Sequence, residues 1–343
     1  MSLTVDIPGA SRAAGRERAR AEGRTAASAL VVALVNNMPD SAVEGTENQF
    51  GGLLRAACDG RDVRLRLTTL PEVTRTPAIA ARVAERYWPL EDIYNDPPDA
   101  LIVTGTEPRA AFLPDEPYWG RLVELMDFAL TEVSGSIWSC LAAHAAVQRF
   151  DGIERRRLPL KRCGVYQHEI LAGDPLMRGL SAPLATPHSR WNDLPIAALE
   201  EAGYRILSRS AETGADAFLR DGRVPMLFFQ GHPEYEDRTL LKEYQRDVGR
   251  FVNGQQERYP NMPVGYFSAD ATRLLERFEA DVVARRVAEP LAAFPFTAVA
   301  ATLVNSWTAS AARIYANWLA QVGAIAAGAG AARAKMASGF SES

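Results

Sequence analysis

Cys140 is the residue best placed for nucleophilic chemistry among the three cysteines of this 343-residue chain. The apolar residues 136–139 precede it and the small residues 141–143 follow it, which predicts a strand, a sharp turn and a helix. A thiol at a helix N-terminus is favoured as thiolate by free backbone N–H groups and by the helix dipole. The alternative is a buried, inert thiol, which is a common state of free cysteine.

His232 and Glu234 form the second candidate feature. His232 follows Gly231 and the apolar residues 226–229, so we expect it at the end of a strand. A carboxylate two residues further on can fix the tautomer of an imidazole that takes protons from a nucleophile. Together with Cys140 they indicate a Cys-His-Glu triad, although histidines at strand ends are often hydrogen-bonded structural residues.

The other three histidines are weaker candidates. His144 lies one helical turn after Cys140, but a thiol on a sharp turn points away from that position, so we expect His144 to pack in the interior. His168 and His188 lie in polar segments that we interpret as loops, where a substrate-binding role and a structural role are equally plausible. No set of residues has the spacing of a metal site, and we expect neither a bound metal nor another bound cofactor.

Three basic residues near these segments are candidates for binding an acidic substrate. Lys161, Arg190 and Arg246 could each hold a carboxylate, and the planar guanidinium of arginine suits a bidentate clamp. For most of the 38 Lys and Arg residues we expect a solvated surface position instead.

The composition limits the classes of function. The chain is 47% hydrophobic and 23% charged, which is typical of a folded globular protein. A formal net charge of -4 argues against a nucleic-acid partner, and apolar runs such as residues 29–35 are too short to cross a membrane. Cys58, Cys140 and Cys163 lack a paired spacing, which favours a reducing, cytoplasmic setting without disulfides or zinc.

Short β-branched runs alternate with helical patterns, which predicts an α/β fold with a doubly wound, mostly parallel sheet covered by helices on both faces. We expect strands at residues 29–35, 63–70, 100–104, 136–139, 204–208, 217–219 and 225–230. We expect helices at residues 47–57, 118–131, 141–150, 238–252, 269–286 and 307–319. Reactive groups gather where loops leave the carboxyl ends of such strands, and Cys140 and His232 both stand at such ends.

The two ends of the chain differ in composition from its middle. Residues 1–27 combine several arginines with Ala, Gly and Ser, which predicts a solvated, mobile tail. Residues 323–343 are rich in Ala and Gly with little to bury, which predicts a frayed, low-complexity tail. Residues 28–322 would then form a single α/β domain.

Several motifs occur together in order along the chain. They are Asn-Met-Pro at 37–39, Thr-Glu-Asn-Gln-Phe at 46–50, Val-Thr-Gly at 103–105, Tyr-Trp at 118–119, Cys140, Gly-Val-Tyr at 164–166, Pro-His-Ser-Arg at 187–190, Gly-His-Pro-Glu-Tyr at 231–235 and Arg-Asp at 246–247. This set resembles the homoserine O-acyltransferases of the glutamine-amidotransferase-like superfamily. The resemblance covers residues 30–320, and Asn-Ser-Trp at 305–307 with Asn-Trp-Leu at 317–319 is similar to the family's C-terminal helix.

The resemblance implies a flavodoxin-like sheet and acyl transfer from an acyl-CoA to the hydroxyl of L-homoserine, an early step of methionine biosynthesis. It makes Cys140 the nucleophile that carries the acyl group, His232 the general base and Glu234 the residue that orients this base. The reaction would be ping-pong, with CoA leaving before the acceptor reacts.

The same resemblance implies roles for residues around the triad. The expected substrate-binding residues are Lys161, Ser189, Arg246 and the neighbouring Arg190. Backbone N–H groups at Leu141 and Thr106 would bind the oxyanion. The substrates would be small molecules, and a homodimer is the family's usual assembly.

One departure from the family's pattern bears on the acyl donor. Family members commonly have Gly-Ala-Pro where residues 105–109 read Gly-Thr-Glu-Pro-Arg. The position matched by Arg109 helps to choose the donor, since glutamate accompanies acetyl-CoA there and glycine accompanies succinyl-CoA. A cation can pair with the free carboxylate of a succinyl group, so we expect a homoserine O-succinyltransferase activity, with acetyl-CoA as the alternative donor.

Alternatives remain for the acceptor substrate and for the class of function. L-serine or another hydroxy amino acid could replace homoserine. A glutaminase-like amide hydrolase would use the same Cys-His-Glu chemistry. In a non-catalytic binding module Cys140 would be inert, and slow alkylation of Cys140 relative to Cys58 and Cys163 would favour that interpretation.

Overall fold

A computed structural model describes residues 2–8, 29–171, 173–285 and 289–339 of the chain. The strands of its central sheet are β1 (Leu3–Asp6), β2 (Leu30–Val35), β3 (Val63–Thr68), β4 (Ala100–Val103), β5 (Ser136–Ser139), β8 (Arg205–Ile206), β11 (Ala217–Arg220) and β12 (Met226–Phe229). Their order is β1-β3-β2-β4-β5-β12-β11-β8; the strands from β1 to β12 pair in parallel, and β11 pairs antiparallel with both β12 and β8. The run β3-β2-β4-β5-β12 has the flavodoxin-like order, which confirms the predicted fold class.

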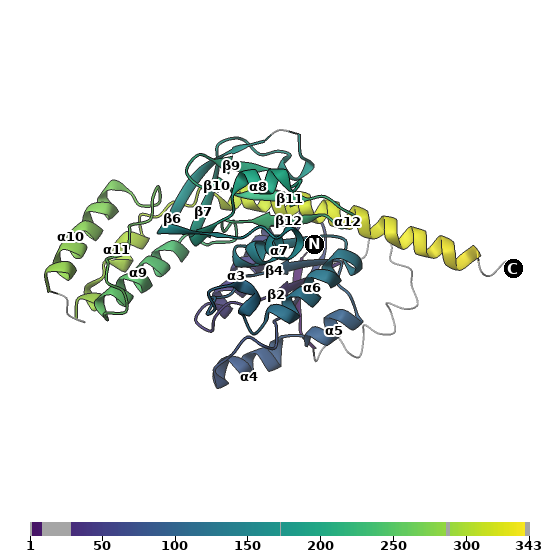
Figure 1. Cartoon of the computed structure of the whole chain (residues 1–343), viewed down its shortest axis with the longest axis horizontal. Helices are drawn as coiled ribbons and strands as arrows, with labels where there is room; N and C mark the ends of the chain where they lie inside the picture. Colours follow the sequence, from purple (N-terminus) through teal and green to yellow (C-terminus); the bar gives the residue numbers. More distant parts are fainter. Residues whose placement is uncertain (1, 9–28, 172, 286–288, 340–343) are drawn as a thin grey trace.

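Helices cover both faces of this sheet (Figure 1). Because side chains alternate along a strand, neighbouring residues of β2 enter opposite cores. Val32 and Leu34 pack with α3 (Val43–Ala57) and α12 (Thr308–Gly339), and Ala33 and Val35 belong to the core that includes α6 (Trp119–Glu132) and α7 (Leu141–Asp151). The shorter helices are α4 (Pro77–Arg86), α5 (Leu90–Asn95) and α8 (Ile196–Glu201). This two-sided burial explains why the central strands are almost wholly apolar.

A long antiparallel hairpin lies where the sequence suggested loops. It consists of β6 (Arg156–Ile170) and β7 (Leu184–Asp193), and β9 (Ser208–Ser210) and β10 (Gly214–Ala215) complete its sheet. The interpretation of the segments around His168 and His188 as loops is therefore wrong. His168 and His188 are both buried in this hairpin, where hydrogen-bond partners such as Thr213 and Arg190 satisfy their ring nitrogens.

A helical lobe packs beside this hairpin (Figure 1). Its helices are α9 (Thr239–Val252), α10 (Ala269–Arg285) and α11 (Phe296–Ala300). They share a core that includes Leu241, Tyr244 and Leu275, and the Trp307 indole nitrogen donates to the backbone oxygen of Tyr235 at 2.7 Å. This packing fixes α9 against the hairpin and turns one face of α9 towards the functional site.

The N-terminal prediction needs a correction. Leu3–Asp6 is not part of a mobile tail but forms the edge strand β1, parallel to β3. Arg66 lies 3.3 Å from the Asp6 carboxylate, and the Trp88 indole donates to the Asp6 carbonyl at 2.6 Å. These contacts from distant segments, which composition does not reveal, hold the strand in place. Most of the predicted tail, residues 9–28, lies outside the described residues.

The C-terminal prediction is also wrong for most of its length. Helix α12 continues to Gly339, whereas the composition suggested a frayed tail from residue 323. Alanine is the strongest helix former, and the helix extends from the buried residues Trp318 and Val322. Residues 340–343 lie outside the described part of the chain, and the assignment of residues 28–322 to one domain stays a prediction.

Among the described residues, no helix is both long enough and apolar enough to form a membrane span.

Candidate active site

Cys140 occupies a sharp turn between β5 and α7, as the sequence predicts. Its backbone has φ 52° and ψ -112°, a conformation that residues with a side chain rarely adopt. The turn is held by the Cys140 N–H, which donates to the Phe229 carbonyl of the neighbouring strand at 2.8 Å. Such a backbone costs on the order of 1–3 kcal/mol and typically marks a functional site. The arrangement is that of a nucleophile elbow, with the thiol at the helix N-terminus.

Gly105 makes room for this elbow from the neighbouring strand end. A Cβ at Gly105 would lie 2.6 Å from the Leu141 Cβ and 3.1 Å from the Leu141 nitrogen, so no larger residue fits without a shift. Leu141 is the first residue of α7, and the first N–H groups of a helix have no acceptor within the helix. Thr106 and Leu141 both line the pocket that contains Cys140, where their N–H groups can face an oxyanion.

His232 and Glu234 lie beside Cys140, as expected from the sheet. Strands β5 and β12 are parallel neighbours with Ser139 opposite Phe229, so both loops leave the same edge. The His232 Nδ1 atom lies 2.8 Å from Glu234 Oε1. The backbone N–H of His232 donates to the Pro187 carbonyl at 2.7 Å. The Tyr235 ring stacks on the imidazole with a centroid distance of 4.3 Å. The ring of His232 is therefore held by Glu234 and Tyr235, and its backbone by Pro187.

The electrostatics favour a charged imidazole. Burial alone would lower the pKa of His232, but the charges of Cys140 and Glu234 and the hydrogen bonds to both raise this pKa well above its usual value. A proton is thus stabilised on His232 when Cys140 is a thiolate, which is the state of an activated cysteine nucleophile. Glu234 stabilises the same imidazolium from the other ring nitrogen.

The pocket in front of Cys140 contains three of the four predicted substrate-binding residues. It has a volume of about 230 Å³ and is lined by Lys161, Ser189 and Arg246, among others. The Lys161 ammonium lies 2.7 Å from Asp247, and half of the Arg246 side chain, 47%, is exposed. The cationic groups of the pocket are therefore paired with an acidic residue of α9.

Sequence reasoning missed Glu243, which is central to this pocket. Ser189 donates a hydrogen bond to Glu243 Oε2, and the Tyr235 hydroxyl donates to Oε1 at 2.7 Å. Burial would raise the pKa of Glu243, but Lys161, Arg246 and these hydrogen bonds hold it below the usual value. A helical spacing of polar residues in α9, namely Glu243, Arg246, Asp247 and Arg250, was the signal that could have identified this face.

Arg190 does not reach the pocket, contrary to the prediction. It is 3% exposed, and its guanidinium donates to the Thr213 carbonyl at 2.7 Å and to Asp193 at 2.6 Å. Because side chains alternate along β7, Ser189 and Trp191 face the pocket while His188 and Arg190 face the interior.

Arg109 also lies apart from the catalytic pocket. Its side chain lines a neighbouring cavity of about 520 Å³, which shares Thr106 and Glu107 with the pocket around Cys140. The backbone of this loop is fixed because the N–H groups of Arg109 and Ala110 donate to Glu116 at 2.6 and 2.7 Å. The role of Arg109 in donor choice stays a prediction.

His144 packs in the interior, as expected. It is 2% exposed, and its Nε2 atom lies 3.1 Å from Gln230 Oε1. Burial, assisted by the charge of Arg190, lowers the pKa of His144 to about 3, so the folded protein holds a neutral imidazole there. His144 is therefore not a rival base.

Because His144 is neutral in the folded protein, we expect the free energy of unfolding to fall in acid. Below pH 6.5 an unfolded His144 gains a proton that the folded state cannot accept until about pH 3, so the free energy of unfolding falls as pH falls through this window. Between pH 7.5 and 5.0 the loss from this residue is about 2 kcal/mol. His144→Gln keeps a donor for Gln230 but cannot ionise. Urea unfolding at both pH values should show a smaller acid loss for the variant, and equal losses would contradict the neutral state.

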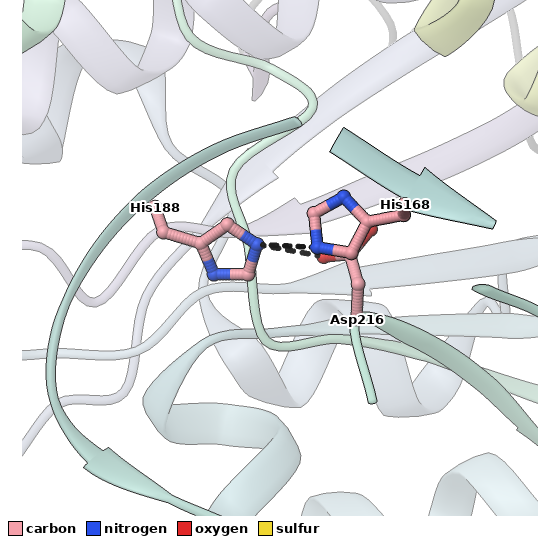
Figure 2. Close-up of side chains that lie close together, drawn as sticks. All are labelled: His168, His188 and Asp216. Carbon is pink, nitrogen blue, oxygen red and sulfur yellow. Dashed lines mark hydrogen bonds and ion pairs between the residues drawn. The ribbon is translucent and has the colours of Figure 1, made fainter. Parts of the chain in front are cut away.

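His168, His188 and Asp216 form the one group of potential metal ligands found among the described residues (Figure 2). The two Nε2 atoms are 3.3 Å apart, and His188 Nε2 lies 3.4 Å from Asp216. However, Arg190 Nε faces His188 Nδ1 at 3.2 Å and can only donate. A neutral His188 must then carry its proton on Nε2, the atom whose lone pair a metal would need.

This cluster instead braces the turn that carries His232. Asp216 Oδ1 accepts the Gly231 N–H at 3.1 Å, and a Cβ at Gly231 would lie 2.6 Å from the same oxygen. His168 is held by Thr213 at 2.8 Å. Burial and the nearby charge of Arg190 lower the pKa of His188 well below its usual value, so His188 stays uncharged at neutral pH. The residues act as buried support for the site.

Comparison with known proteins identifies the family to which this chain is similar. The family model described as homoserine O-succinyltransferase matches residues 12–325. A protein of that name from Rhodopseudomonas palustris is 43% identical over 316 residues, which cover 92% of this chain and 95% of the relative. One from Methylorubrum extorquens is 44% identical over 295 residues, covering 85% and 87%.

The chain is also similar to solved structures. A glutamine amido transferase from Methylobacillus flagellatus aligns with a TM-score of 0.48 at 15% identity, over 85% of this chain and 94% of the other.

Proposed function

Because this chain belongs to the homoserine O-succinyltransferase family, we propose that it transfers a succinyl group from succinyl-CoA to the hydroxyl of L-homoserine in methionine biosynthesis. The observation that carries the proposal is the strained Cys140 elbow beside the His232–Glu234 pair. An inert structural cysteine has no need of such a backbone or of a buried imidazole held by a carboxylate.

The reaction has two acyl-transfer steps. The Cys140 thiolate attacks the thioester carbon of the donor, the tetrahedral oxyanion forms, and the CoA thiolate leaves with a proton from His232. The homoserine hydroxyl then gives its proton to His232 while its oxygen attacks the acyl-enzyme, and the Cys140 thiolate leaves. The products are CoA and O-succinyl-L-homoserine. The N–H groups of Leu141 and Thr106 would stabilise both oxyanions.

The acceptor fits the charged end of the pocket. An amino acid at neutral pH carries a carboxylate and an ammonium group. The half-exposed guanidinium of Arg246, one side of which lies 3.2 Å from Asp247, can also bind the carboxylate, and the ionised Glu243 offers an acceptor for the ammonium. Lys161 and Ser189 hold Glu243 in place. Homoserine and L-serine share these groups, so serine is the alternative acceptor.

The cellular setting and the choice of donor are proposed from the family. We place the enzyme in the cytoplasm as a homodimer that needs acyl-CoA as a co-substrate and no bound cofactor. Acetyl-CoA is the alternative donor, and Arg109 is the proposed selector of succinyl-CoA. A glutaminase-like hydrolase and a binding module are the competing classes of function.

Intact-protein mass spectrometry without an acceptor tests the proposal. The purified enzyme is mixed with succinyl-CoA and, separately, with acetyl-CoA. We expect a single succinyl adduct that maps to Cys140 and that disappears on addition of L-homoserine, with less adduct from acetyl-CoA and slower discharge by L-serine. Absence of any adduct on folded protein would contradict the acyltransferase mechanism and favour the hydrolase or the binding module.

A further inference from the structure

A further cavity, distinct from the one beside Arg109, lies near the start of the β6–β7 hairpin. It has a volume of about 360 Å³ and lies between residues 108–113, the end of α7 and the start of β6. Four of its lining residues are important here: Phe112, Arg155, Arg157 and Asn192. The proposed reaction does not use any of them.

The cavity contains two arginines, Arg155 and Arg157. Among the residues that the structure describes, neither of them makes an ion pair, and Glu154 is the single acidic residue in the cavity lining. Burial lowers the pKa of Arg155 and the charge of Arg157 acts in the same direction, whereas the charge of Glu116 opposes them. A half-buried guanidinium that no carboxylate contacts directly is stabilised when an anion binds it. The charge pattern therefore favours an anionic ligand.

Two exposed aromatic side chains lie at or near this cavity: Phe112 lines it, and Trp191 contacts the lining residue Arg157. Phe112 is 63% exposed and Trp191 is 42% exposed, which is unusual for such large apolar groups. The Arg157 guanidinium lies over the Trp191 ring at 4.5 Å from its centroid. Trp191 also lines the pocket that contains Cys140, so it stands between the two spaces. A ligand can therefore extend from Cys140 past Trp191 to the arginines.

The larger cavity beside Arg109 is less suited to an anion. Its lining contains four acidic residues, Asp40, Glu72, Glu107 and Glu116. It contains two arginines, but the Arg75 guanidinium already donates to the Met38 and Asn36 carbonyls. The balance of charge there is negative, whereas the cavity with Arg155 and Arg157 has a positive balance.

We propose that the cavity with Arg155 and Arg157 binds the nucleotide end of the acyl-CoA donor, with the two guanidinium groups on its phosphates, Phe112 against its aromatic base and Trp191 beside the arm that carries the thioester to Cys140. This assignment rests on the proposed function, because it places the donor whose thioester reaches Cys140. Arginine holds phosphate oxygens through paired N–H groups, and any nucleobase can stack on an exposed aromatic face.

Calorimetric titration with free CoA tests this assignment without turnover. Arg155→Ala and Arg157→Ala should each weaken CoA binding by about 10-fold to 100-fold, the effect of losing a charge-assisted contact. The matched control is Arg156→Ala, which removes the same charge from an exposed neighbouring position that does not line the cavity, and it should bind as the wild type does. A change of less than about twofold in both cavity variants would overturn the assignment.

Two further measurements keep the test decisive. Trp191→Phe should weaken binding and remove a CoA-dependent change in tryptophan fluorescence, which a purely structural role would not produce. If Arg155→Ala melts at a lower temperature than the wild type, Arg155→Lys replaces it and should still bind CoA several-fold more weakly, since an ammonium lacks the paired donors.

The outcomes separate this inference from the proposed function. If Arg155→Ala binds CoA normally but forms the acyl-enzyme more slowly with succinyl-CoA and not with acetyl-CoA, then Arg155 recognises the succinyl carboxylate and the nucleotide assignment is wrong. CoA binding that depends on Arg155, without any acyl-enzyme, would support the cavity and contradict the transferase. Acyl-enzyme formation with unchanged CoA affinity in both arginine variants would support the transferase and contradict the assignment of the cavity.

Discussion

Cys140→Ser should form no acyl-enzyme and should lose at least about 10³-fold in turnover, because a serine hydroxyl is a much weaker nucleophile than a cysteine thiolate at neutral pH. The strained backbone at φ 52° accepts serine as well as cysteine, so the fold should be retained. Intact-mass analysis with succinyl-CoA measures the first effect, and release of CoA in the presence of L-homoserine measures the second.

Cys58→Ala is the control for this substitution. Cys58 is buried, its thiol contacts the Leu54 carbonyl at 3.2 Å, and it lies outside the catalytic pocket. This variant should keep wild-type turnover apart from a modest loss of stability. Alkylation should also favour Cys140, since burial raises the pKa of Cys58 and raises that of Cys163 to about 12. Full turnover by Cys140→Ser would refute the covalent mechanism.

Glu234→Gln should lower kcat by about 10³-fold to 10⁴-fold, as expected when the group that fixes a catalytic histidine tautomer is made neutral. An amide at this position no longer stabilises the imidazolium. Since Glu234 helps to raise the pKa of His232, the pKa should be lower in the variant. A raised histidine pKa keeps the proton bound below it and loses the proton as pH rises, so the variant should lose the imidazolium at a lower pH.

The pH dependence of Cys140 alkylation measures this change. In the wild type the charged pair should persist to higher pH than in Glu234→Gln. Glu236→Gln is the matched control, because Glu236 is exposed two residues later on the same segment and does not line the pocket. Equal kcat values and equal pH profiles for wild type and Glu234→Gln would remove Glu234 from the catalytic site.

The central strands of the fold could be predicted from local patterns in the sequence. Strands β2, β4, β5 and β12 are short apolar runs with turn residues at their ends, and each was expected within about two residues of its observed bounds. Their parallel order followed from the alternation with helices. The hairpin of β6 and β7 was missed because many of its residues are polar, some exposed and others buried with partners from elsewhere in the chain, and polar strands look like loops in a sequence.

The residues of the candidate site could be predicted only in part from the sequence. Cys140 and His232 were identified because each stands directly after an apolar strand, and the elbow needs only local sequence. Arg190 was misplaced because one residue along a strand reverses the side on which a side chain lies. Glu243 was missed because its partners, Ser189 and Tyr235, come from other elements and meet it only in the folded chain.

By itself, the sequence determined the class of fold and the placement of Cys140, His232 and Glu234 at strand ends, since these depend on periodicity and on residues close together in the chain. The family was indicated by the resemblance of motifs that are spread along the chain. The tertiary structure alone decided that Arg190 and His188 support the site from within, that Glu243 belongs to the pocket, and that Arg155 and Trp191 line two different cavities. Charge pairing and burial depend on contacts between distant segments, and one residue's type does not reveal which segment will face it.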